Sequence, residues 1–145
     1  MRHRTCGSHP QIRDYGGEPL VFNIQHATNK NENFRTALWT GRDLQLTLMS
    51  IPVCGAIGAE MHSDLDQFIR IESGKARVYM GTCRGGLQEV SCVDGNDAIL
   101  IPAGTWHNLV NIGKCPLKLY SLYAPPTHPF GTLSRTREDA EHAEH

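Results

Sequence analysis

The chain has 145 residues, a hydrophobic fraction of 39% and a formal net charge of −1. This length fits one domain that buries its core without disulfides, and the charge argues against a nucleic-acid groove or a polybasic membrane patch. The five cysteines form no C-x-x-C pair, which argues against a disulfide framework and a zinc finger. We therefore expect reduced thiols in a cytoplasmic protein, without a signal peptide or a membrane-length apolar run.

The residue pattern divides the chain into three parts. Residues 1–19 are polar, contain prolines and glycines, and are expected to form an N-terminal arm. Residues 20–134 form the expected β-domain, which opens with a short apolar strand at 20–24. Residues 135–145 are charged and alanine-bearing, which predicts a solvated C-terminal helix or a disordered tail.

From residue 34 onward, apolar and polar residues alternate with a period of two, which is typical of half-buried strands. Ser73-Gly74-Lys75 lies between two of these strands and predicts a hairpin. Many short strands separated by glycine and proline indicate an all-β sandwich or closed barrel. The strands are expected at 34–39, 44–49, 68–72, 76–80, 98–101, 107–112 and 117–123.

Two segments carry residues with metal-binding chemistry. Glu60 and His62 lie two apart, so in a strand they project from the same face. Gln67 follows a short polar bend, and His107 follows a proline-glycine turn that would aim it back inward. These side chains come from distant parts of the chain, so they could converge only in a closed barrel.

The two segments resemble the paired motifs of the cupin superfamily. In the first motif, Glu60 and His62 stand at the two histidine positions, Gln67 stands at the glutamate, and Gly74 keeps its spacing. The second motif, P-x-G-x-x-H-x-x-x-N, is matched by four residues: Pro102, Gly104, His107 and Asn111. The resemblance spans about residues 34–130 and implies a single-domain jelly-roll β-barrel. It is strongest to small bacterial cupins that are often labelled mannose-6-phosphate isomerase-like.

The resemblance implies a divalent metal ion held by Glu60, His62, Gln67 and His107. The usual set of three histidines and one glutamate carries one negative charge, and this set also carries one. Two histidines and a carboxylate suit Zn²⁺ or Fe²⁺, while Mn²⁺ and Ni²⁺ stay open. Gln67 could be a weak fourth ligand or only orient a water, and Asp64 could supply the carboxylate instead of Glu60, although an acidic turn is the simpler interpretation.

Several other residues could have either a functional or a structural role. Arg35 and Arg70 could bind a phosphate, but surface ion pairs are the simpler interpretation. Tyr123 and His128 could line a pocket, although structural roles are commoner at such positions. The remaining expectations are that Trp106 packs at the barrel mouth and that Cys54 and Cys92 are small buried hydrophobic residues.

The function that this pattern favours is a metal-dependent enzyme, such as an isomerase, acting on a small polar substrate such as a sugar or sugar phosphate. An iron-dependent dioxygenase and a non-catalytic small-ligand-binding cupin are the alternatives. No residue is identified as the general base. A homodimer is expected, because small cupins commonly pair through sheet faces and the strand at 20–24 could cross to a partner sheet.

Overall fold

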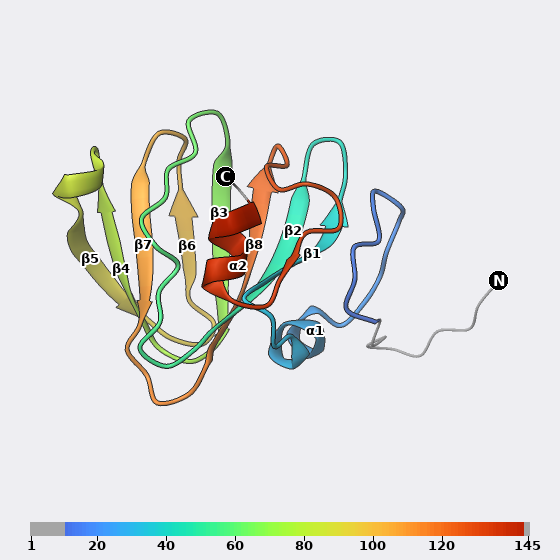
Figure 1. Cartoon of the computed structure of the whole chain (residues 1–145), viewed down its shortest axis with the longest axis horizontal. Coiled ribbons are helices and arrows are strands. Elements are labelled where there is room, and N and C mark those ends of the chain that lie inside the picture. The colour runs from blue at the N-terminus through green and yellow to red at the C-terminus, as the bar shows by residue number, and fades with distance from the viewer. Residues whose placement is uncertain (1–10, 144–145) are drawn as a thin grey trace.

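The structure is a computed structural model that describes residues 11–143. In this part of the chain, antiparallel strands form two sheets, a six-stranded sheet in the order β6-β3-β8-β2-β1-β9 and a three-stranded sheet in the order β5-β4-β7 (Figure 1). The strands are β1 (Arg35–Thr40), β2 (Gln45–Ile51), β3 (Asp66–Ser73), β4 (Ala76–Gly81), β5 (Gln88–Val93), β6 (Ala98–Ile101), β7 (Trp106–Asn111), β8 (Leu117–Ala124) and β9 (Leu133–Ser134). The helices are α1 (Ile24–Lys30), the 3₁₀ turn η1 (Arg84–Gly86) and α2 (Arg137–Ala143).

The all-β jelly-roll prediction is confirmed, and the alternation of side chains explains why the two sheets close on one core. In β3, Ile69 and Ile71 are fully buried, while the alternate residues Phe68 and Arg70 point to the other face. The inner residues of β2, β3, β4, β6, β7 and β8 join in one hydrophobic cluster between the sheets. The helix expected in the tail is also present as α2, whose Ala140 packs against this cluster.

The barrel interior changes from apolar at one end to polar at the other. Along the inner face of β8, Leu117 and Leu119 are followed by Ser121 and Tyr123. The neighbouring strands change in the same direction, because register places Thr47 of β2 opposite Ser121, and Gln67 of β3 opposite Tyr123. Matching changes on adjacent strands produce a polar layer at one end of the barrel, and this layer holds the site described below.

The strand expected at residues 20–24 is wrong. This stretch is irregular and leads into α1, which begins after Asn23, whose side chain accepts a hydrogen bond from the His26 amide at 2.8 Å. The apolar side chains of this region pack on the outer face of the six-stranded sheet of their own chain. The residues in this contact are Ile12 and Tyr15 of the arm, together with Phe22 and Ile24.

The hairpin expected at Ser73-Gly74-Lys75 is also wrong, although both flanking strands exist. β3 pairs with β6 and β8, whereas β4 pairs with β5 and β7, so this turn carries the chain from one sheet to the other. Gly74 has φ +103°, and a Cβ there would lie 3.0 Å from the Leu117 Cα. The corner therefore requires glycine for both conformation and space. None of the helices within residues 11–143 is long and apolar enough to cross a membrane.

Candidate metal centre

Backbone pairing between the two motif segments places Glu60 and His107 side by side. The Glu60 amide donates to the His107 carbonyl and the His107 amide donates to the Glu60 carbonyl, each at 2.9 Å. Directly opposed residues of an antiparallel pair project to the same face, so both side chains point to the same interior space. A further bond from the Gly104 amide to the His62 carbonyl, at 2.8 Å, ties His62 to the same strand end.

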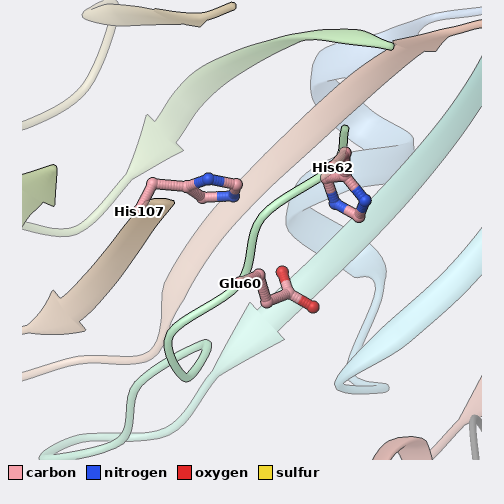
Figure 2. Close-up of side chains that lie close together, drawn as sticks. All are labelled: Glu60, His62 and His107. Carbon is pink, nitrogen blue, oxygen red and sulfur yellow. The ribbon is translucent and has the colours of Figure 1, made fainter. Parts of the chain in front are cut away.

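These three residues form a group that could hold a metal ion. One ligand atom from each of Glu60, His62 and His107 lies within 4.8 Å of the others. Figure 2 shows the two imidazoles and the carboxylate around a common space, with His62 and Glu60 on one segment and His107 at the start of a strand. The sequence therefore named three residues that the fold brings together from two distant segments.

The outer ring nitrogen of His107 is fixed by the backbone. Nδ1 lies 3.1 Å from the Thr105 carbonyl oxygen, and because a carbonyl only accepts, Nδ1 carries the proton. Nε2 is then a free lone pair, and it is buried without a hydrogen-bond partner in a residue that is 1% exposed. A bond from one ring nitrogen to a carbonyl is the arrangement that orients metal-bound histidines.

His62 is half-buried, and its Nε2 is also buried without a hydrogen-bond partner. Burial lowers the pKa of His62, with smaller contributions in the same direction from His107, His128 and Arg35, while Glu60 opposes them. The neutral imidazole is therefore favoured, and this is the form that coordinates a metal.

Gln67 lies on the same interior face as Tyr123, the residue directly opposite it in β8. Its side chain is buried, and the amide nitrogen donates to the Ser121 hydroxyl at 3.3 Å. Its carbonyl oxygen Oε1 is buried without a hydrogen-bond partner. A buried acceptor without a donor costs folding free energy unless a cation or a water molecule lies next to it.

The donor chemistry of the site fits a divalent transition metal. Two imidazole nitrogens and a carboxylate are the donors of hydrolytic zinc sites and of the facial triad of iron oxygenases. Each of the two histidines presents a buried nitrogen with no other partner, and the carboxylate supplies charge. Glu60 has a side chain that is 21% exposed, so the site is open to solvent on that side.

The surface position that the sequence predicts for Arg35 is wrong. The Arg35 side chain is 3% exposed, and its Nη2 lies 3.8 Å from the Glu60 carboxylate. In β1 the sequence does not show which face is the interior one, because the strand is buried on both faces, with Leu38 under the N-terminal arm. An arginine here was therefore indistinguishable from a surface strand residue.

Tyr123 and His128 line the site rather than serving only as distant structural residues. The Tyr123 ring meets the His62 ring edge-on, with centroids 5.7 Å apart, and meets the His128 ring at 5.1 Å. Both residues are buried. The signal that could have found them is the polar end of β8, where a tyrosine follows Ser121 at the inner positions.

The second motif divides into structural and site positions. Gly104 has φ +85° and lies in the turn that returns the chain to β7, where side-chain-bearing residues are disfavoured. Asn111 has a structural role, since its side-chain Nδ2 donates to the backbone carbonyls of Ile51, Pro52 and Cys115. His107 is therefore the member of this motif that belongs to the site.

The other candidate residues from the sequence lie outside the group of Glu60, His62 and His107. Asp64 is exposed and is not part of the metal-ligand group, and Arg70 donates to the Asn96 side chain at 2.9 Å. Trp106 is half-buried next to the guanidinium of Arg84, at 5.9 Å. The expectation that Cys54 and Cys92 are buried is wrong, because both are exposed. They lie outside the core, at positions that the alternating pattern does not mark.

Comparison with known proteins agrees with this geometry. The Cupin_2 family, described as Cupin domain, matches residues 47–123. The uncharacterized protein YrkC of Bacillus subtilis is 53% identical over 133 residues, which cover 92% of this chain and 72% of that protein. The crystal structure of BH2720 from Bacillus halodurans matches with a TM-score of 0.88 and 52% identity, covering 90% of this chain and 99% of that one.

More distant structures share the fold alone. KdgF from Halomonas sp. matches with a TM-score of 0.55 and 19% identity over 64% of this chain and 80% of that chain. The family match covers more than half of the chain, and the Bacillus subtilis relative is similar over most of its length. The chain therefore belongs to the cupin family.

Proposed function

We propose that this cupin binds one divalent metal ion through Glu60, His62 and His107, with the side-chain oxygen of Gln67 as the fourth donor, and acts as an enzyme on a small polar substrate. The observation that carries the proposal is the pair of buried Nε2 atoms on His62 and His107, each without a hydrogen-bond partner, beside a carboxylate. Unpaired buried imidazole nitrogens are costly, and a shared cation satisfies both at once.

The leading reaction is isomerisation of a sugar or sugar phosphate, as in the mannose-6-phosphate isomerase-like proteins that the motifs resemble. When bound, the ion supplies a Lewis acid that polarises a substrate carbonyl. Tyr123, as a buried phenol next to His62, can donate a hydrogen bond to a substrate oxygen. His128 is a titratable group beside Tyr123 and outside the ligand set, so it is the residue we assign to move a proton between adjacent carbons.

The second candidate is an iron-dependent dioxygenase, which the donor set itself favours. Two histidines and one carboxylate are the protein ligands of the facial-triad oxygenases. Both candidates need the same three residues, so they differ in the identity of the ion and in the reaction rather than in the site.

The metal proposal is tested by measuring the ion content of protein purified without added metal. We expect about one ion per chain in the wild type, and much less in His62→Ala and His107→Ala, with both variants still folded. His26→Ala, an exposed histidine of α1, is the matched control and should keep the ion. Full metal content in both site variants would overturn the proposal.

The reaction is tested separately from the metal. Proton exchange into a panel of aldose and ketose phosphates in D₂O, followed by NMR, reports isomerisation. Oxygen consumption by anaerobically iron-loaded protein reports the oxygenase. Neither activity, together with a bound ion and saturable ligand binding, would identify a non-catalytic binding protein.

We also propose that the protein forms a homodimer, and the apolar edge of the six-stranded sheet supports this. Leu100 on the edge strand β6 is 74% exposed and pairs in register with the partly buried Phe68 of β3. Leu100→Glu should shift a dimer to a monomer in light scattering at micromolar concentration. A wild-type monomer at that concentration would contradict the proposal.

A cytoplasmic location remains part of the proposal. The cysteines at positions 54, 83, 92 and 115 are all free and exposed. Exposed free thiols suit a reducing compartment, where they do not form disulfides. Alkylation of the native protein in intact cells, read by mass spectrometry, should find these thiols reduced.

A further inference from the structure

A guanidinium group lies buried at the candidate metal centre. Arg35 enters from β1, its side chain is 3% exposed, and its Nη2 lies 3.8 Å from the Glu60 carboxylate. This separation is within the range of an ion pair, so the two groups attract each other electrostatically. The desolvation of a buried guanidinium is expensive, so its charge favours anionic groups nearby.

The charge of the site changes once an ion is present. Glu60 supplies one negative charge, and Arg35 supplies one positive charge. The charges of Glu60 and Arg35 cancel each other. The two positive charges of a bound divalent ion would then be uncompensated, because both imidazoles bind in their neutral form. A site of this charge, partly shielded from water, is a favourable environment for an anion.

The geometry lets one ligand reach both cations. Arg35 and the metal ligands meet at Glu60, whose carboxylate belongs to the ligand cluster and also lies next to the guanidinium. Glu60 is the partly exposed member of the Arg35–Glu60 pair, so a ligand that enters from solvent on this side would reach the carboxylate before the guanidinium. The planar fork of arginine matches the two oxygens of a carboxylate or phosphate.

We propose that Arg35 anchors an anionic group of the substrate, a carboxylate or a phosphate, while neighbouring substrate oxygens face the metal position. This inference rests on the proposed metal-dependent function and narrows its substrate class to small oxyanions. It also gives Arg35 a role beyond that of a counter-ion to Glu60.

The test uses three ligands with one carbon skeleton. Glycerol is neutral, glycerate adds a carboxylate, and glycerol 3-phosphate adds a phosphate. Calorimetry on metal-loaded wild-type protein should show at least one of the two anions binding about tenfold or more tightly than glycerol. The stronger of the two anions tells whether the anchored group is a carboxylate or a phosphate.

Arg35→Gln should lower the affinity for that anion by about 10- to 100-fold and leave glycerol binding unchanged. The ion content of this variant should equal that of the wild type. Arg35→Lys keeps the charge without the fork and should fall between the two, which also covers the case in which Arg35→Gln does not fold. Arg70→Gln is the matched control, since Arg70 is a strand arginine on the outer face, bonded to Asn96.

Three results would overturn the inference. The first is equal anion affinity in the wild type and both Arg35 variants, and the second is a wild type that prefers glycerol. The third is loss of the ion from Arg35→Gln, which would show that Arg35 only holds Glu60 in place. If the wild type itself holds no ion, the proposed function fails. The role of Arg35 is then decided by comparing the binding of inorganic phosphate to metal-free wild type and to metal-free Arg35→Gln, where equal binding would overturn the inference.

Discussion

The imidazole rings of His62 and His107 lie 5.9 Å apart, centroid to centroid, and each presents a buried Nε2 that has no hydrogen-bond partner. Two such atoms so close together, from segments 45 residues apart in the sequence, indicate a shared partner rather than two separate packing defects. The Glu60–His107 backbone bridge explains the closeness, since it fixes both motif segments in one register.

The carboxylate of the site can be identified by comparing two alanine variants. Glu60 lies in the ligand cluster, whereas Asp64 is exposed and outside it. Glu60→Ala should lower metal affinity by at least about tenfold. The loss of a residue that only hydrogen-bonds to a metal ligand already lowers affinity by about that factor. Asp64→Ala should leave the affinity unchanged, as measured by competition with a chromophoric chelator. A loss of metal in Asp64→Ala alone would reverse the assignment.

Gln67→Glu should have opposite effects with and without the ion. In metal-free protein it places a carboxyl group in a buried position next to Ser121, which should lower the melting temperature. In metal-loaded protein the new carboxylate is a stronger ligand than the amide, so the increase in melting temperature on adding Zn²⁺ should exceed that of the wild type.

Thermal melts of both proteins, with and without Zn²⁺, measure this difference. Gln67→Leu is the control, because it fills a similar volume without a donor atom and should show a smaller metal-induced increase. If Gln67→Glu and Gln67→Leu respond identically to the ion, Gln67 does not face the metal position.

The fold was predictable because its signals are local. Period-two alternation identified most strands, and the motif Pro102, Gly104, His107 and Asn111 identified the second half of the barrel. The pairing was harder to predict, because a glycine turn such as the one at Gly74 is equally compatible with a hairpin and with a crossover between sheets. β5 was missed, since its side chains are nearly all exposed and carry no buried alternation.

The candidate site was predictable only in part, for a similar reason. Glu60, His62 and His107 follow a known spacing, whereas Arg35, Tyr123 and His128 reach the site through the tertiary fold. A buried arginine has no sequence signature that distinguishes it from a surface one. Its position becomes visible only in the folded structure, where Arg35 lies next to Glu60.

Asn111 should prove structural rather than functional. Its amide nitrogen donates to three backbone carbonyls at 3.0 to 3.2 Å, and its Oδ1 accepts from the Gly113 amide at 2.8 Å. Asn111→Ala leaves these buried and partly buried backbone groups without their partner and should lower the free energy of unfolding by about 2–4 kcal/mol. Urea denaturation measures this cost.

The control for this prediction is Asn29→Ala, which removes one exposed side-chain contact to Ser73 and should cost less than about 0.5 kcal/mol. The metal content of folded Asn111→Ala should match that of the wild type, because the residue lies away from the ligands. Loss of the ion with unchanged stability would instead give Asn111 a role in the site.

Tyr123 should ionise later than an ordinary tyrosine. Burial raises its pKa, and the nearby Arg35 offsets this only in part. An ordinary tyrosine in the unfolded chain titrates near about 10. The neutral phenol is therefore favoured in the folded state, and this contribution to stability is full below the unfolded pKa and is lost as the pH rises toward the folded pKa.

Alkaline titration of metal-free protein, followed by tyrosinate absorbance, tests this directly. The component that disappears in Tyr123→Phe should have a midpoint above about 10, and the wild type should lose more unfolding free energy between about pH 9 and pH 11 than the variant does. Tyr15→Phe, which removes a phenol that donates to the Gln11 carbonyl outside the barrel, controls for the loss of one chromophore. A missing component with an ordinary midpoint would mean that water reaches the Tyr123 hydroxyl, and the polar end of the barrel would then be too wet for the neutral hydrogen-bond donor assigned to it.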